Sequence, residues 1–353
     1  MRYKNHLIAG FGLGLLCMSM AHSAPSTSTC PNPPPLKAPP NFMWGLTAYH
    51  VPLPGYELYP EDLQKMAANG IKWISVDFAW KRIEPVRGAQ YDFSYFDMLT
   101  QEAAKNGIQI VGKLANGYNT PMRAVSPEWT AFLSADDYLA EMDKYARAVV
   151  SRYGNTVHYW ALENELNIDF FHVMLGWRAH TWSPQVKDKI VWTLNQAVHD
   201  SAPDAKTILT VSTTLLPTFG NYIQRVSQQV NYDMVGMFDY PIYELNTNQD
   251  SLDNGLCGRV ATVEQTSGGK PALIMESGYQ TSNSRRTPQA QAGYVTAVTK
   301  SALHAGVGGV FFYEYLDNPQ EFLPREQHFG LLQADRTPKP AWTDYGNLIK
   351  AYQ

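Results

Sequence analysis

Two glutamates occupy positions where the chain could carry out acid–base chemistry. Glu165 follows the apolar run Tyr159–Leu162 closely, and Glu276 directly follows Leu273-Ile274-Met275. Hydrolysis of a glycosidic bond needs such a pair, with one carboxyl group protonated and the other ionised. The alternative is a pair of buried structural ions. Neither segment holds an arginine that would compensate a buried carboxylate, so we favour the chemical interpretation.

The elements that position these glutamates follow from hydrophobic periodicity. From Phe42 onward, short runs rich in Val, Ile and aromatic residues alternate with longer helical patterns, which predicts parallel strands joined by helices. We expect strands at Phe42–Thr47, Lys72–Phe78, Gln109–Leu114, Val157–Leu162, Thr207–Ser212, Met234–Phe238, Ala272–Met275 and Gly309–Tyr313. We expect helices at Pro60–Asn69, Ser94–Asn106, Ala135–Arg152, Pro184–Ser201, Gly220–Gln229, Arg259–Thr266, Pro288–His304 and Ala341–Ala351.

This even series predicts a single (β/α)₈ barrel of the α/β class. The alternative is an open doubly wound sheet, but no G-x-G-x-x-G follows the first strand, where a dinucleotide site would need it. Chemistry in such barrels occurs at the carboxyl ends of the strands. Both glutamates are therefore expected on the same face.

The N-terminus has the order of a secretory signal peptide. Arg2 and Lys4 precede an apolar run, Leu7–Met20, which small residues follow. We predict a signal peptide over residues 1–21, a Pro-rich arm over 22–41 and a catalytic domain over 42–353, hence a secreted or periplasmic protein. An uncleaved anchor is less favoured, because the run is shorter than the roughly 20 residues that span a bilayer. Cys30 and Cys257 would then form one disulfide or stay as two free thiols.

Composition excludes several classes of function. The formal charge of −4 offers no electrostatic footprint for nucleic acid or an anionic membrane. H-E-x-x-H, clustered Cys and His, a phosphate loop and G-x-S-x-G after a strand do not occur, which disfavours metal, nucleotide and serine-hydrolase chemistry. We predict no metal and no cofactor. We expect a monomer with a carbohydrate partner, since 9 Trp and 21 Tyr could supply flat faces for sugar rings, although large cores use the same residues.

Several motifs together carry a resemblance to a known group of enzymes. They are Asn164-Glu165 after a strand, Glu276 ending a later one, Lys72–Trp80 followed by Ile83-Glu84-Pro85 and Tyr91-Asp92-Phe93, and Phe329–Leu332 followed by Thr337–Ala341. The chain thereby resembles clan A of the glycoside hydrolases over nearly its whole predicted mature length. It is most similar to family 39, which includes bacterial endoglycosidases that act on biofilm exopolysaccharide.

The resemblance implies a retaining double displacement, with Glu165 as acid/base and Glu276 as nucleophile. It implies that Asn164 binds the hydroxyl beside the reacting carbon and that Tyr240 orients the nucleophile. Further residues near predicted strand ends are expected to bind substrate, namely His50, Trp80, Asn116, Trp177, Tyr243 and Glu314. A non-catalytic glycan-binding barrel and a transglycosidase remain as alternatives.

Three positions depart from the clan pattern. Ser75 stands where the clan usually has Arg, Phe238 where it has His, and Glu163 where it has Trp. The missing Arg removes a cation that would keep the nucleophile ionised, so either Lys113 or His50 takes its place or the enzyme is slow. Strand alternation puts Glu163 on the side of Glu165, which predicts either a third active carboxylate or a hydrogen-bonded core group.

Overall fold

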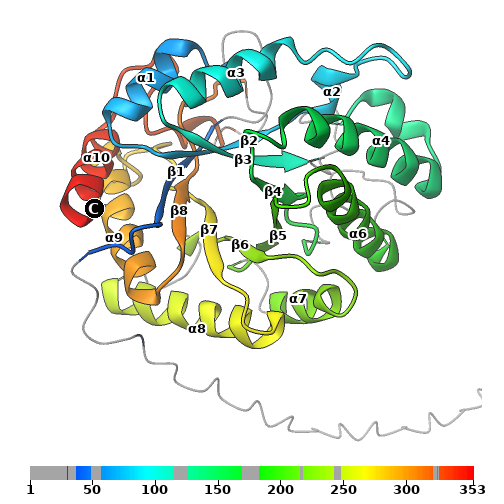
Figure 1. The fold of residues 1–353 in the computed structure, drawn as a ribbon. Helices are drawn as coiled ribbons and strands as arrows, with labels where there is room; N and C mark the ends of the chain where they lie inside the picture. The colour runs from blue at the N-terminus through cyan, green and yellow to red at the C-terminus, as the bar shows by residue number, and fades with distance from the viewer. Residues whose placement is uncertain are drawn as a thin grey trace, which may run out of the picture.

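Eight parallel strands close into one barrel in the computed structural model, and each strand pairs with its neighbours in chain order. The structure describes residues 30, 37–48, 57–114, 126–168, 183–214, 218–241, 248–320, 324 and 326–353. The strands are β1 (Met43–Thr47), β2 (Trp73–Asp77), β3 (Gln109–Leu114), β4 (Tyr159–Leu162), β5 (Lys206–Ser212), β6 (Met234–Phe238), β7 (Ala272–Ser277) and β8 (Gly309–Phe312). β1 pairs with β8, which closes the ring seen in Figure 1.

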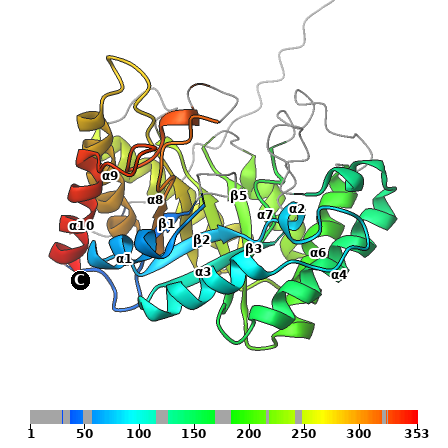
Figure 2. The ribbon, with the colours of Figure 1, turned by 90° about the horizontal axis from the view of Figure 1, so that it is seen from above.

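The helices form a layer around this ring (Figure 1). They are α1 (Pro60–Ala68), α2 (Trp80–Ile83), α3 (Ser94–Lys105), α4 (Ala135–Tyr153), α6 (Pro184–Ser201), α7 (Phe219–Ser227), α8 (Gln249–Ser267), α9 (Pro288–Ala305) and α10 (Pro340–Tyr352), with 3₁₀ segments η1 (Glu128–Phe132) and η3 (Glu326–His328). Helices α1 and α3 lie side by side on the flank of β1 to β3 (Figure 2). The expected (β/α)₈ barrel is confirmed.

The barrel interior is apolar along most of its length. Its lining residues point inward from alternate positions of the strands, and they are Met43, Trp73, Val111, Ala161, Ile208, Phe238, Leu273, Met275 and Phe311. The absence of a side chain at Gly45 leaves room for the ring of Phe311 inside the barrel, because a Cβ atom at Gly45 would lie only 2.3 Å from that ring. The charged side chains Asp77 and Lys113 lie at the carboxyl ends of β2 and β3.

One helix begins ten residues earlier than its sequence pattern suggested. We expected it to start at Arg259, but α8 starts at Gln249, where the side chain of Asn248 caps it by accepting a hydrogen bond from Ser251 N. Gly255 and Gly258 each cost a helix about 1 kcal/mol relative to Ala. Burial of Leu252 and Leu256, at about 1.5–3 kcal/mol per side chain, outweighs that cost.

A disulfide ties the N-terminal arm to the outer helix layer. Cys30 and Cys257 are bonded, with their Cα atoms 5.6 Å apart, so the paired alternative is the one that the structure adopts. The arm is also held at Ala38, whose N–H donates to Tyr352 O at 2.8 Å. The predicted signal peptide lies outside the described residues and stays a prediction. None of the described helices has both the length and the apolar character required to cross a bilayer.

Beside this disulfide, the carboxylate of Asp253 connects α8 to α9. Its Oδ1 accepts hydrogen bonds from Ser301 Oγ and from Gln249 Nε2 at 2.8 Å, and its Oδ2 lies 3.0 Å from His304 Nδ1. Burial alone would raise the pKa of Asp253, but the hydrogen bonds from Ser301, Gln249 and His304 hold it below its ordinary value. The ionised form is therefore bound more tightly in the folded state than in the unfolded one.

Replacing this carboxylate should give a pH-dependent loss of stability. A lowered pKa contributes stability that is present above the pKa of the unfolded state and is lost as the pH falls through the folded pKa. We expect Asp253→Asn to lower the free energy of unfolding by about 1–3 kcal/mol at pH 7, with the difference from wild type shrinking below about pH 4. Urea unfolding between pH 7 and pH 3 measures this, and Asp204→Asn, at an exposed loop position, is the control. If the difference in unfolding free energy between wild type and Asp253→Asn stays constant with pH, the lowered pKa of Asp253 is contradicted.

Candidate active site

The carboxylate of Glu276 is held by two groups from neighbouring strand ends. Lys113 Nζ, on β3, lies 2.9 Å from Oε1, and the hydroxyl of Tyr240, just after β6, donates to Oε2 at 3.0 Å. Lys113 also lies 3.3 Å from Asp77 Oδ1 at the end of β2. Glu276 is 6% exposed and Lys113 2% exposed. One oxygen thus contacts a cation and the other a phenol, which fixes the orientation of the carboxylate.

Lys113 is a permanent positive charge in this buried cluster. Burial alone would lower its pKa, but the carboxylates of Asp77 and Glu276 outweigh that effect and raise it above the ordinary value. Of the two cations considered as replacements for the missing Arg, Lys113 is the one that contacts Glu276, while His50 lies outside the described residues. The ring of Phe238, where the clan has His, lies 5.6 Å from Lys113 Nζ and offers it a cation–π contact.

The hydroxyl of Tyr240 is hydrogen-bonded to Glu276 and also lies within the electrostatic influence of Glu165. Burial and the neighbouring carboxylate of Glu276 raise its pKa well above the ordinary value, with further contributions from Tyr313 and Glu165. Glu165 follows β4 and Glu276 lies near the end of β7, so both glutamates are at the carboxyl end of the barrel. The ring of Tyr240 packs edge to face against Tyr313 and Phe329, with centroids 6.5 and 6.2 Å away, and this fixes the phenol in turn.

A tight turn after β4 carries Asn164 and Glu165. Glu163 and Glu165 have φ values of +66° and +49°, in the left-handed region that side chains other than glycine rarely adopt. Thr210 Oγ1 donates to Glu163 O at 2.8 Å, and Asn164 N donates to Glu163 Oε2 at 3.1 Å. These bonds hold a conformation that would otherwise be unfavourable, as strained functional turns require.

The turn is also anchored to the next strand. Asn167 Nδ2 donates to Ser212 O at 2.8 Å, and Ser212 N donates to Asn167 Oδ1 at 2.9 Å, a reciprocal pair across the ends of β4 and β5. Glu165 is half-buried at this point. Asn164 is 8% exposed, and none of the described residues hydrogen-bonds its Oδ1. This amide oxygen is therefore a buried acceptor that none of the described residues satisfies.

Glu163 does not lie beside Glu165 as strand alternation suggested. The strand ends at Leu162, and the positive φ of Glu163 redirects its side chain. After burial, its carboxylate is the main cause of the raised pKa of Tyr138 on α4, and it also contributes to the raised pKa of Tyr222 on α7. Glu163 is fully buried toward the helix layer, which fits the alternative of a hydrogen-bonded core group.

Two residues expected to bind substrate lie in the core instead. Trp80 is fully buried, because its ring stacks on Tyr145 at 5.0 Å and its Nε1 donates to Glu84 Oε2 at 2.9 Å, so it has no face open to a sugar. Glu314 is also fully buried, because the chain after β8 folds back and Leu331 N donates to Glu314 O at 2.8 Å. The remaining predicted binding residues, His50, Asn116, Trp177 and Tyr243, lie outside the described residues.

Sequence reasoning missed Asp77. The signal was present, because Asp77 ends a buried strand just as Glu276 follows the apolar run of β7. What the pattern did not show is that Asp77 and Lys113 are register partners on adjacent strands and so meet at the same height in the barrel. Among the described residues, no three His, Cys, Asp or Glu side chains are close enough together to hold a metal ion.

Comparisons with known proteins point to β-glycosidases. Residues 54–132 match the model of glycoside hydrolase family 42, described as beta-galactosidase. A 6-phospho-beta-glucosidase of Dickeya chrysanthemi is 29% identical over 150 residues, which is 41% of this chain and 30% of that protein. The chain thus spans less than a third of the length of the curated relatives that it matches in this way.

Solved structures confirm the barrel fold. A beta-glucosidase from Thermotoga maritima in complex with azafagomine superposes with a TM-score of 0.70 at 15% identity, covering 90% of this chain and 99% of that one. A family 39 glycoside hydrolase from Bacteroides cellulosilyticus WH2 has a TM-score of 0.62 at 19% identity, covering 87% of this chain and 63% of that one. The resemblance to clan A is confirmed, and family 39 is one neighbour among several families.

Removing the buried cation should be far more costly than removing a surface one. Lys113→Met leaves two buried carboxylates uncompensated, so we expect a loss of about 3–5 kcal/mol in the free energy of unfolding. Combining it with Asp77→Asn should recover part of that loss, because one of the two charges is gone. Lys206→Met, which breaks the exposed pair with Asp233, should cost at most about 1 kcal/mol. Urea unfolding at pH 7 compares them, and equal losses for the two lysine variants would refute the argument.

Proposed function

We propose that this chain is a glycoside hydrolase that cleaves β-linked O-glycosidic bonds in an oligosaccharide or polysaccharide by a retaining double displacement. The observation that carries the proposal is the carboxylate of Glu276, fixed between Lys113 and Tyr240, with Glu165 acting on the same phenol. The β-glycosidase names of the matched relatives support it.

In the first step, the carboxylate of Glu276 attacks the anomeric carbon while Glu165 protonates the leaving oxygen. The glycosidic bond breaks, and the sugar is held as an ester of Glu276. In the second step, Glu165 takes a proton from water, and the water oxygen attacks the same carbon and displaces Glu276. Two displacements at one carbon return the original configuration.

The surroundings of Glu276 suit both steps. Attack consumes the negative charge of Glu276, so a lone buried cation would oppose it by stabilising the starting carboxylate. Asp77 shares the ammonium of Lys113 and so weakens that opposition. In the second step the charge returns to Glu276, and both Lys113 and Tyr240 are already positioned to receive it.

The amide oxygen of Asn164, which none of the described residues hydrogen-bonds, supports a contact with the substrate. It lies one residue from Glu165 and is buried without a partner among the described residues. A sugar hydroxyl beside the reacting carbon would satisfy it, and a buried acceptor left without a hydrogen bond costs about 1–3 kcal/mol. The substrate would therefore supply a bond that none of the described residues makes.

We further propose that the protein is exported and acts on a matrix exopolysaccharide. The N-terminal pattern of residues 1–21 motivates export, and the Cys30–Cys257 disulfide supports it, because disulfides persist in oxidising compartments. The substrate rests on the resemblance of the sequence. Added protein should then loosen biofilms whose matrix holds the right glycan, and inactivity on every matrix glycan tested would exclude this substrate.

Hydrolysis of aryl β-glycosides and polysaccharides by variants tests the assignment of roles. Glu276→Gln should lower kcat by at least about 10³-fold on every substrate, because the nucleophile is gone. Glu165→Gln should lower kcat/KM as severely on substrates with poor leaving groups but much less on dinitrophenyl glycosides, whose leaving group needs no proton, while kcat on the latter stays low because the second step has lost its base. Glu264→Gln, at an exposed position on α8, is the control and should behave as wild type.

NMR of the first-formed anomer completes this test. Retention of configuration in wild type is expected, and inversion would overturn the double displacement. Unchanged activity in either Glu165→Gln or Glu276→Gln would refute the role given to that residue.

A further inference from the structure

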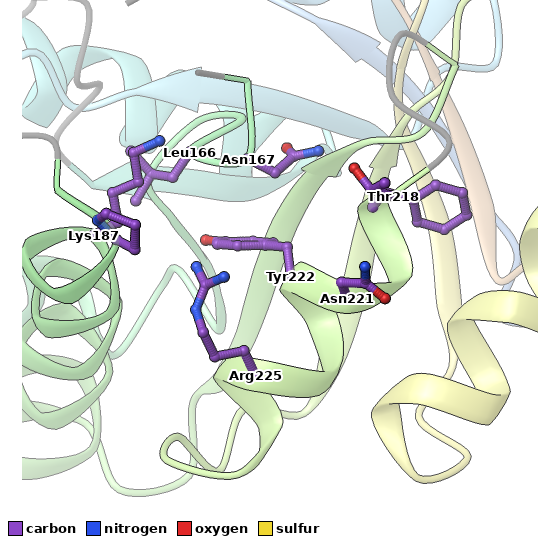
Figure 3. A pocket seen from close by; sticks show the side chains of 9 residues that line it. Leu166, Asn167, Lys187, Thr218, Asn221, Tyr222 and Arg225 are labelled. Carbon is purple, nitrogen blue, oxygen red and sulfur yellow. The ribbon is translucent and has the colours of Figure 1, made fainter. Parts of the chain in front are cut away.

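A separate cavity of about 310 Å³ lies beside the turn that carries Glu165 (Figure 3). It is lined by Leu166, Asn167, Pro184, Lys187, Thr218, Phe219, Asn221, Tyr222 and Arg225. Pro184 and Phe219 are the first residues of α6 and α7, and crossover helices begin at the carboxyl ends of the strands. The cavity therefore lies at the same end of the barrel as the catalytic pair, while neither glutamate lines it.

The side chains lining this cavity are mainly hydrogen-bond donors. Its charged lining residues are both cations, Lys187 and Arg225. Lys187 is only 2% exposed, and Arg225 is held in place by Asp188 through contacts of 2.9 to 3.2 Å. Figure 3 shows the ring of Tyr222 reaching from α7 toward Lys187, with the guanidinium of Arg225 beside its hydroxyl end.

The hydroxyl of Tyr222 points to a missing ligand. Tyr222 is 5% exposed, and none of the described residues hydrogen-bonds its Oη. Burial and the carboxylate of Asp188 raise its pKa, so the hydroxyl keeps its proton and is a donor at neutral pH. A buried donor without an acceptor costs about 1–3 kcal/mol, which a bound acceptor would offset.

The start of α7 also favours an electron-rich ligand in this cavity. The side chain of Thr218 makes no cap hydrogen bond at this nine-residue helix, in contrast to that of Ser183 at α6, although the backbone carbonyl of Thr218 accepts from Asn221 N at 3.0 Å. Free N–H groups at a helix start favour negative charge. Together with Lys187 and the Tyr222 hydroxyl, they favour an anionic group with several acceptor oxygens.

We propose that this cavity binds the carboxylate of an acidic sugar residue in the substrate chain, next to the bond that is cleaved. The proposal rests on the proposed function for its statement that this sugar belongs to the substrate. Asn167 is two residues after Glu165, and a chain spans at most about 3.6 Å per residue, so their Cα atoms lie within about 7 Å of each other. A volume near the lower limit for small-molecule sites suits one sugar residue.

Binding of single sugars tests the proposal without any need for catalysis. D-glucuronate carries a carboxylate where D-glucose carries a hydroxymethyl group. Ligand-observed NMR titration of the full chain measures the affinity for each sugar. We expect glucuronate to bind and glucose to bind at least tenfold more weakly. Tyr222→Phe should weaken glucuronate roughly 3- to 10-fold through one lost hydrogen bond, and Lys187→Met should weaken it more. Glu276→Gln should leave binding unchanged.

Folding of the variants is checked by urea unfolding. Tyr222→Phe removes a hydroxyl that bonds nothing in the described residues, so its stability should equal or exceed that of wild type, which keeps this variant informative even if Lys187→Met fails to fold. No glucuronate binding at tens of millimolar, equal binding of glucose, or unchanged binding in Tyr222→Phe would overturn the proposal. If the chain binds glucuronate but hydrolyses no glycoside, the cavity still binds an acidic sugar and only the proposed hydrolase function is refuted.

Discussion

The constraint on which the site depends is the burial of the Glu276 carboxylate together with the charges that compensate it. Glu276 is 6% exposed, and an isolated buried charge costs several kcal/mol. Lys113 compensates it at 2.9 Å, but Lys113 is buried as well and needs a second carboxylate, which Asp77 provides at 3.3 Å. The ends of β2, β3 and β7 thus form one electrostatic unit. Tyr240, after β6, completes it with a neutral donor whose pKa is raised by that same environment.

The second carboxyl group is positioned by backbone strain rather than by charge. Glu163 and Glu165 adopt positive φ values, which a chain holds only when its surroundings impose them. Thr210 and Ser212 on β5 supply that restraint through the carbonyl of Glu163 and the amide of Asn167. The position of Glu165 therefore depends on the register between β4 and β5, and the cation that contacts Glu276 depends on the register between β2 and β3, which aligns Lys113 with Asp77.

The sequence predicted what strand periodicity controls and failed where tertiary contacts decide. The strands and the two glutamates at their ends follow from apolar runs, and the structure has the expected barrel. Trp80 was misassigned because no pattern reveals that Tyr145, 65 positions later, covers its ring. Glu163 was misplaced because strand alternation ends where φ becomes positive. A Gly at this position would have indicated a positive φ, whereas a Glu does not. The early start of α8 was not predicted because Gly255 and Gly258 disfavour a helix, and the burial of Leu252 and Leu256 outweighs that cost.

The departures from the clan pattern form a consistent set once the cluster is seen as a whole. Ser75, where an Arg is usual, is buried on β2 two residues before Asp77, and none of the described residues hydrogen-bonds its Oγ. The cation comes from the adjacent strand instead, where Lys113 pairs in register with Asp77. Phe238, in place of His, presents its ring to that ammonium at 5.6 Å and is the register partner of Glu276. The chain therefore keeps a positive charge against the carboxylate of Glu276, although that charge comes from β3 and the clan's Arg is absent from β2.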